Sequence, residues 1–138
     1  MKYILFILCL FISNPSLASS KVKKSQQISW NSLIKAIIYV ESRGQRFAKN
    51  GKSIGIMQIT PIMVDECNRI LKRRNSKSRY KLIDRYSAVK SKEMFFLIQS
   101  VYNPRNDAEH AIRLWNGGPH YKKKHTQRYY ERVMRAMK

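Results

Sequence analysis

The feature that most constrains the fold of this chain is an apolar stripe at helical spacing that includes a carboxyl group. Counting back from Glu41, apolar side chains recur at intervals of three or four residues, at Ile38, Ile37, Ile34, Leu33 and Trp30. These positions share one face of an α-helix, and Glu41 lies on the same face. Ser29 is a suitable N-cap, and Gly44 is suited to end the helix. The pattern predicts a buried helix whose last turn carries an acid on its buried side.

A glutamate at that position has altered acid–base properties. Burial disfavours the charged carboxylate, and the negative end of the helix dipole acts in the same direction, so the pKa rises. A carboxyl group that keeps its proton near neutral pH can serve as a general acid. The alternative is that Glu41 only borders the core and pairs with a nearby Lys or Arg, and this helix on its own favours that alternative.

The start of the chain has the pattern of a secretory signal peptide. Lys2 precedes an apolar run from Tyr3 to Ile12, and Ser16-Leu17-Ala18 fits the small-x-small cleavage rule. The run is too short to span a bilayer. We expect residues 1–18 to be removed, with Ser20 as the alternative end, and an uncleaved anchor is the competing interpretation. The prediction places the protein in the periplasm or outside the cell.

Removal of the signal peptide leaves 120 of the 138 residues, enough for one domain with a hydrophobic core and too few for two. We expect a single domain over residues 19–138. Apolar residues recur at helical spacing, and alternation at period two is nowhere sustained, so the predicted class is mostly α. We expect the later helices over residues 61–74, 88–102 and 126–137, another from Asn106 or Asp107 to Gly117-Gly118, and loops over residues 45–54 and 75–85. On the helix over residues 88–102, the expected inner face comprises Met94, Leu97, Ile98 and Val101.

Cysteine and histidine usage argues against a metal enzyme. Cys9 is lost with the signal peptide, so Cys67 has no partner for an internal disulfide, and its apolar neighbours favour a place in the core. The three histidines, His110, His120 and His125, lack the spacing of a zinc site. We expect no metal ion and no other cofactor.

The chain is strongly basic. Lys and Arg total 28 against 8 Asp and Glu, a net charge of +20, which becomes about +19 without Lys2. Such a surface attracts anionic polymers through a long-range, salt-dependent field. For an exported protein these are cell-wall polymers, lipopolysaccharide, anionic lipid or nucleic acid. Basic clusters such as Lys72-Arg73-Arg74 indicate this class of partner and no chemistry.

Two further stretches contain residues suited to a binding cleft. In the segment from Ser53 to Pro61, SIGIMQITP, Gly55 permits a close backbone approach, and the amide of Gln58 needs hydrogen-bond partners if it is buried. In RLWNGGP, Trp115 and Asn116 precede two glycines, and sugar-binding clefts use aromatic faces and amides. Taken alone, the first could be an ordinary buried turn and the second a core Trp with Asn116 as a helix C-cap.

Together, the three segments resemble the soluble lytic transglycosylase (SLT) domain, a relative of goose-type lysozyme. The family pattern is E-S, then G-L-M-Q-I, then A-Y-N-A/G-G. This chain has Glu41-Ser42, Gly55-Ile56-Met57-Gln58-Ile59 and Trp115-Asn116-Gly117-Gly118 in the same order. Thr126-Gln127-Arg128-Tyr129 and Val133 resemble the terminal T-x-x-Y-V-x-x-V. The resemblance implies a lysozyme-like helical domain with its active-site cleft beside the end of the first mature helix.

The resemblance covers about residues 29–134 and implies roles for the matching side chains. Glu41 would be the catalytic acid and base. The residues matched to the substrate cleft are Ser42, Gly55, Met57, Gln58, Trp115, Asn116 and Tyr129. Trp115 replaces a family Tyr, so a hydroxyl that could orient the acid is missing there, and Tyr129 or Tyr102 could compensate. The family's loop serine corresponds to Asn50 or Ser53.

The acid inventory favours a mechanism with one carboxyl group. Ordinary glycosidases use two, about 5 Å apart for retention or about 6.5–9.5 Å apart for inversion. None of the other seven acids falls in a segment matched to the cleft, although Asp107 and Glu109 stay open. The resemblance implies cleavage of the β-1,4 bond between N-acetylmuramic acid and N-acetylglucosamine in peptidoglycan. Glu41 would act as acid and then as base, forming 1,6-anhydromuramic acid ends.

Three alternatives remain at this point: a lysozyme-type hydrolase of the same bond, a catalytically weak cationic wall-binding protein, and a cationic protein that binds lipopolysaccharide or nucleic acid. The expected partners are peptidoglycan glycan strands and other anionic envelope polymers, without specific nucleic-acid recognition. A secretion or conjugation machine stays open as a further partner. We expect a monomer associated with the cell wall.

Overall fold

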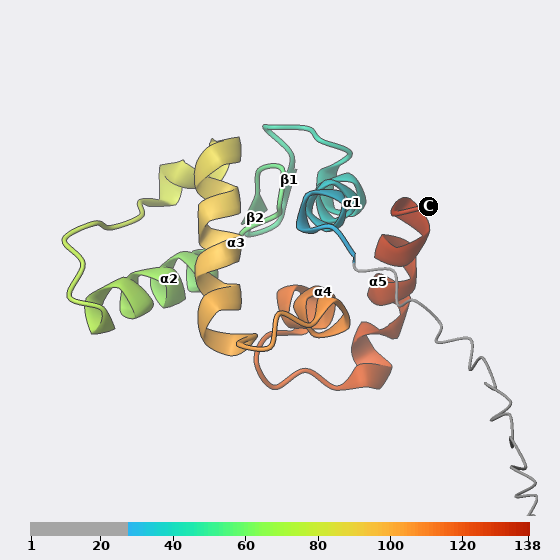
Figure 1. Ribbon diagram of the computed structural model, residues 1–138. Helices are drawn as coiled ribbons and strands as arrows, with labels where there is room; N and C mark the ends of the chain where they lie inside the picture. The colour runs from blue at the N-terminus through green and yellow to red at the C-terminus, as the bar shows by residue number, and fades with distance from the viewer. Residues whose placement is uncertain (1–27) are drawn as a thin grey trace, which may run out of the picture.

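The computed structural model describes residues 28–138, so the predicted signal peptide lies outside the described residues. The described chain is built mainly from helices, which confirms the mostly α prediction (Figure 1). Its elements in chain order are α1 (Trp30–Ser42), β1 (Lys49–Asn50), β2 (Ser53–Ile54), α2 (Pro61–Arg73), the 3₁₀ turn η1 (Leu82–Tyr86), α3 (Ala88–Tyr102), α4 (Ala108–Gly117) and α5 (Lys123–Ala136). No helix among these residues combines the length and the apolar character needed to cross a membrane.

The helices form two groups with the β1–β2 hairpin between them (Figure 1). In one group α5 packs against both α1 and α4, and in the other α3 packs against α2 and η1. The side chain of Arg85 joins η1 to the hairpin region, because its guanidinium donates to the carbonyl oxygens of Lys52 at 3.0 Å and Ile59 at 3.4 Å. The hairpin and the loop from Gly55 to Ile59 that follows it, which we call the G-x-M-Q loop after Gly55, Met57 and Gln58, are therefore joined to η1.

Side-chain caps account for the starts of α2, α3 and α4, whereas Ser29, the expected cap of α1, makes no capping hydrogen bond. Thr60 and Ser87 accept backbone N–H groups at the starts of α2 and α3, each at 3.3 Å, and Pro61 occupies the first turn of α2, as predicted. The bounds of α3 are those expected, and α4 begins after Asp107, which caps it. Side chains that accept the unpaired N–H groups of a first turn fix where a helix starts.

Two predictions about the bounds of elements were wrong. The expected loop over residues 45–54 contains the antiparallel hairpin, in which Lys49 pairs with Ile54 and Asn50 with Ser53. Strands of two residues are too short to produce a detectable alternation. Helix α5 begins at Lys123, three residues before the expected start. Its first turn consists of polar residues and so gives no apolar period.

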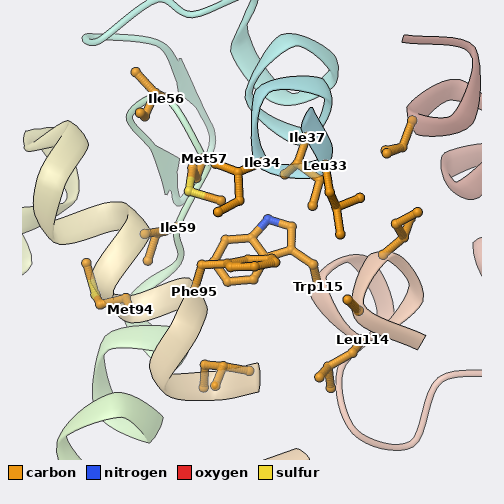
Figure 2. Close-up of a cluster of buried hydrophobic side chains, with 14 of the residues drawn as sticks. Leu33, Ile34, Ile37, Ile56, Met57, Ile59, Met94, Phe95, Leu114 and Trp115 are labelled. Carbon is orange, nitrogen blue, oxygen red and sulfur yellow. The ribbon is translucent and has the colours of Figure 1, made fainter. Parts of the chain in front are cut away.

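The core lies where α1, α3 and α4 meet the G-x-M-Q loop (Figure 2). Phe95 of α3 and Trp115 of α4 pack edge to face, with ring centroids 5.1 Å apart. The expected inner face of α3 needs correction, because Phe95 is fully buried whereas Val101 is 36% exposed. Cys67 is buried, and burial raises the pKa of its thiol to about 12, so it belongs to the core.

Candidate active site

A cleft of about 450 Å³ opens beside the end of α1. Five parts of the chain supply its walls: the last turn of α1, the hairpin with the following loop, the start of α2, the end of α4, and α5. The lining residues are Val40, Glu41, Asn50, Ser53, Gln58, Thr60, Met63, Trp115, Asn116, Gly118 and Arg132. Within the described part of the chain, Glu41 is the one carboxyl group that lines this cleft.

Glu41 is half-buried and is held by the last helix. Its Oε1 accepts a hydrogen bond from the hydroxyl of Tyr129 at 2.7 Å. Burial raises the pKa of Glu41, while the Tyr129 hydrogen bond and the positive charge of Arg132 lower it, and burial has the largest effect. Glu41 therefore keeps its proton to higher pH than an exposed glutamate, as a general acid requires.

The partner hydroxyl stays protonated as well. Burial, together with the charge of Glu41 and the hydrogen bond to it, raises the pKa of Tyr129 well above the ordinary value for tyrosine. The tyrosine is thus a hydrogen-bond donor across the working pH range and supplies the contact that Trp115 cannot make. The other candidate, Tyr102, donates to Glu66 at 2.7 Å instead and does not line the cleft.

The hairpin and the following loop form one wall of the cleft. Asn50 and Ser53 face each other across the hairpin and both line the cleft, so both positions proposed for the family's loop serine are present at the site. Gln58 takes a left-handed backbone conformation, with φ of 50°. Its amide nitrogen donates to the carbonyl oxygens of Gly55 at 3.0 Å and Ala48 at 3.3 Å, which fixes the side chain against the loop.

Four residues matched to the cleft do not line it: Tyr129 bonds to Glu41 from α5, and Ser42, Gly55 and Met57 support the cleft from behind. The hydroxyl of Ser42 donates to the carbonyl oxygen of Ile56 at 2.8 Å and so joins the end of α1 to the loop. Gly55 packs against the backbone of Arg85, where an added Cβ would lie 1.9 Å from the carbonyl oxygen. Met57 is fully buried in the core (Figure 2).

Comparison with known families agrees with this arrangement. The family model described as the transglycosylase SLT domain matches residues 18–137. The chain belongs to this family. Its helical architecture is that of a lysozyme-like SLT domain, and membership implies transglycosylase-type activity on peptidoglycan. No curated protein and no solved structure matched the chain in the corresponding searches.

Trp115 of this SLT domain does not present an open aromatic face on which a sugar ring could stack. Trp115 is only 7% exposed, and most of its ring packs in the core between α1 and Phe95 (Figure 2). Its remaining surface lines the cleft next to the exposed Asn116. Helix α4 extends through Gly117, so Asn116 is not the helix cap. The Trp thus anchors this wall, and Asn116 offers an amide to a ligand.

Sequence reasoning missed Arg132, the one basic residue that lines the cleft in the described part of the SLT domain. Its guanidinium donates to the carbonyl oxygen of Val40 at 3.0 Å, next to Glu41 in the chain. The sequence could have indicated Arg132, because Tyr129 and Arg132 are three residues apart on one helix and therefore share a face. A tyrosine assigned to the active site makes its helical neighbour a candidate.

A larger cavity, of about 970 Å³, lies between the start of α1 and the start of α4 and contains Asp107 and Glu109. Asp107 caps α4, and Glu109 is paired with Arg113 at 2.8 Å. Neither Asp107 nor Glu109 lines the cleft of the SLT domain, so neither is the second carboxyl group that the sequence left open. Within residues 28–138, no three His, Cys, Asp or Glu side chains are grouped to hold a metal ion.

The hydrogen bond from Tyr129 gives a testable pH effect. Tyr129→Phe removes a contact that favours the charged form of Glu41 and leaves its burial in place, so the pKa of Glu41 should rise further. A general acid works while it is protonated, so the alkaline limb of the kcat/KM profile should move to higher pH. Tyr102→Phe, which removes a hydroxyl bound to Glu66, should leave that limb in place. A limb that does not move in Tyr129→Phe would contradict the assigned contact.

Proposed function

We propose that this protein is a peptidoglycan lytic transglycosylase. It cleaves the β-1,4 bond between N-acetylmuramic acid and N-acetylglucosamine and leaves 1,6-anhydromuramic acid ends. The observation that carries the proposal is a single half-buried carboxyl group, Glu41, held by a tyrosine hydroxyl in the wall of a cleft. No second carboxylate among the described lining residues is available to act as a nucleophile or to activate water.

The reaction then proceeds in two steps through one residue. Glu41 gives its proton to the glycosidic oxygen as the bond from C1 to that oxygen breaks, and the N-acetyl group of the substrate stabilises the positive charge at C1. The Glu41 carboxylate next removes the proton of the 6-hydroxyl, and the bond between O6 and C1 forms. The carboxyl group ends in the state in which it began, and no water is consumed.

The contacts around Glu41 suit both steps. Oε1 accepts the hydrogen bond from Tyr129, which leaves Oε2 to transfer the proton. Burial favours the protonated form needed first, while Tyr129 and Arg132 favour the carboxylate needed second. These opposing influences keep both forms accessible within one turnover, as a residue that acts as acid and then as base requires.

Product mass tests the reaction type directly. Digestion of purified peptidoglycan should release muropeptides with 1,6-anhydro ends, each lighter by one water than the product of hydrolysis. Mass spectrometry of the digest distinguishes the two, and a digest in water enriched in ¹⁸O should show no label at the new ends. Labelled, hydrated reducing ends as the main product would mean that water reaches the intermediate, and the lysozyme-type alternative would replace the proposal.

We also propose that the protein is exported and works in the periplasm or outside the cell, where its substrate lies. The support is the pattern of Lys2, the apolar run and Ser16-Leu17-Ala18. N-terminal sequencing of protein recovered from the cell envelope or the medium should give a chain that begins at Ser19. Protein that begins at Met1 and stays in the membrane fraction would refute the cleavage prediction.

A further inference from the structure

A second, shallower hollow adjoins the cleft on the side of the helix ends. It has a volume of about 250 Å³ and is lined by Tyr39, Val40, Arg43, Arg132, Arg135 and Ala136. Val40 and Arg132 line both spaces, so the two are neighbours along the surface. We call this second space, with Arg43, Arg132 and Arg135 on its wall, the arginine hollow.

The arginine hollow combines three positive charges with no acid. None of its lining residues is a carboxylate, and within residues 28–138 none of its three arginines takes part in an ion pair. All three side chains are exposed. Each guanidinium has five N–H donors, and the protein contacts of Arg43 and Arg132 use few of them. The remaining donors are free to bind an anion.

The conformation of Arg43 adds an independent observation. Arg43 follows the last residue of α1 and has a left-handed backbone, with φ of 56°. Glycine takes this conformation at lower cost and is the usual residue at such a helix end. Here Gly44 comes one residue later, and Arg43 occupies the strained position. Its guanidinium donates to the Tyr39 hydroxyl at 2.6 Å and lies 4.8 Å from the ring centroid, which holds it at the hollow. Strained backbone conformations cluster at functional sites, so the strain at Arg43 suggests that its side chain has a function there.

We propose that the arginine hollow binds a carboxylate carried by the muramic acid unit of a glycan strand seated in the cleft. The inference rests on the proposed function. Each N-acetylmuramic acid bears a lactyl group, which ends either in a free carboxylate or in a stem peptide with carboxylates of its own. Guanidinium groups match carboxylates in geometry and bind them through paired, charge-assisted hydrogen bonds. Uncharged glycans lack this contact, so the hollow selects muramic acid units and orients them relative to Glu41.

Binding measurements on an inactive protein test the hollow separately from catalysis. In the Glu41→Gln background, calorimetry would give Kd for three probes: a disaccharide–peptide muropeptide, the peptide-free muramoyl disaccharide, and an N-acetylglucosamine tetramer. Arg135→Gln removes one charge that does not line the catalytic cleft. It should weaken binding of at least one carboxylate-bearing probe about five- to tenfold and leave the neutral tetramer unchanged. Arg135→Lys should restore part of the loss.

A matched control separates a local contact from the general positive field. Arg74→Gln removes the same charge from the end of α2, outside the residues that line either space. It should have little effect at physiological salt, because exposed charges beyond a Debye length are screened. A loss confined to the peptide-bearing probe identifies stem-peptide carboxylates as the ligand, and a loss confined to the peptide-free probe identifies the lactyl carboxylate.

Three results would overturn the arginine hollow as a carboxylate site: unchanged affinity of Arg135→Gln for all probes, an equal loss on the neutral tetramer, or an equal loss in Arg74→Gln. If Arg135→Gln has no effect while the wild-type protein still forms anhydro ends, the hollow is refuted and the proposed function stands. If no probe binds and no cleavage occurs, both fail.

Discussion

Replacing Glu41 with Gln is expected to lower peptidoglycan cleavage by about 10³–10⁴-fold, the upper part of the range for general acid–base catalysis. The amide keeps the shape of the side chain and can still accept the hydrogen bond from Tyr129, but it has no proton to transfer. One residue serves both half-reactions in the proposed mechanism, so both would be lost together. Release of soluble muropeptides from purified walls, followed over time, measures the effect.

Glu66→Gln is the matched control. Glu66 also accepts a tyrosine hydroxyl at 2.7 Å, from Tyr102, but it does not line the cleft. Its replacement removes contacts to Arg69 and Arg73 and leaves the active site intact, so cleavage should stay within about threefold of wild type if the site is undisturbed. Full activity in Glu41→Gln would remove Glu41 from the mechanism and leave it as a carboxyl group at the edge of the core.

Thermal unfolding of Glu41→Gln tests whether a loss of activity comes from unfolding. The pKa of the Glu41 carboxyl group is higher in the folded protein than in the unfolded chain. The contribution of this group to stability is therefore fully present at pH values below its pKa in the unfolded chain, and it is lost as the pH rises through its pKa in the folded protein. A Gln at this position does not ionise. The Tm of Glu41→Gln relative to wild type should therefore increase from acidic to neutral pH. A relative Tm that falls over this range would contradict the raised pKa.

Gly55→Ala should have the largest effect on stability among single-methyl additions, about 3 kcal/mol or more in the free energy of unfolding. The added Cβ would lie 1.9 Å from the backbone carbonyl oxygen of Arg85, which cannot yield without displacing η1. The residue also has φ of 81°, a conformation that costs a side-chain-bearing residue further energy. Chemical denaturation of the purified variant measures the loss.

Gly51→Ala separates the two causes. Gly51 also has positive φ, 57°, but nothing lies within 4 Å of the position of an added Cβ. Its substitution should therefore cost only the backbone conformation, about 1 kcal/mol. If the two variants lose the same stability, the close approach between Gly55 and Arg85 is absent in solution. Because the G-x-M-Q loop forms one wall of the cleft, Gly55→Ala should lower cleavage as well.

Helices α2, α3 and α4 could be predicted from sequence because their starts depend on local chemistry, whereas α5 has no side-chain cap and its start was missed. Pro61 and the caps Thr60 and Ser87 act within one turn of the helix they start, so the sequence around them is sufficient. Burial depends on partners distant in the chain. The expected inner face of α3 therefore included Val101 and missed Phe95, whose position is set by Trp115 of another helix. The hairpin was missed because each of its strands has only two residues.

The candidate site divides in the same way. The helical period placed Glu41 on a buried face, and the resemblance to the family left Tyr129 and Tyr102 as alternatives for the hydroxyl that orients it. The structure was needed to show that Tyr129 makes the contact. Packing also determines two other features of the site. It buries Met57 in the core, and it brings Arg43 at the end of α1 next to Arg135 of α5. Residue type indicated the chemistry of the site, whereas the direction of each side chain required the structure.

Because of the contact between Glu41 and Tyr129, the ionisation of the catalytic carboxyl group depends on the packing of α5 against α1. The two residues are 88 positions apart, on the first and last helices of the described chain, and Arg132 reaches the site from the same last helix. Any local opening that separates α5 from α1 removes the hydroxyl, the positive charge and part of the burial at once. The ionisation of Glu41 then returns toward that of an exposed glutamate. A titration of this one carboxyl group, followed by NMR, thus reports whether the two helices are docked.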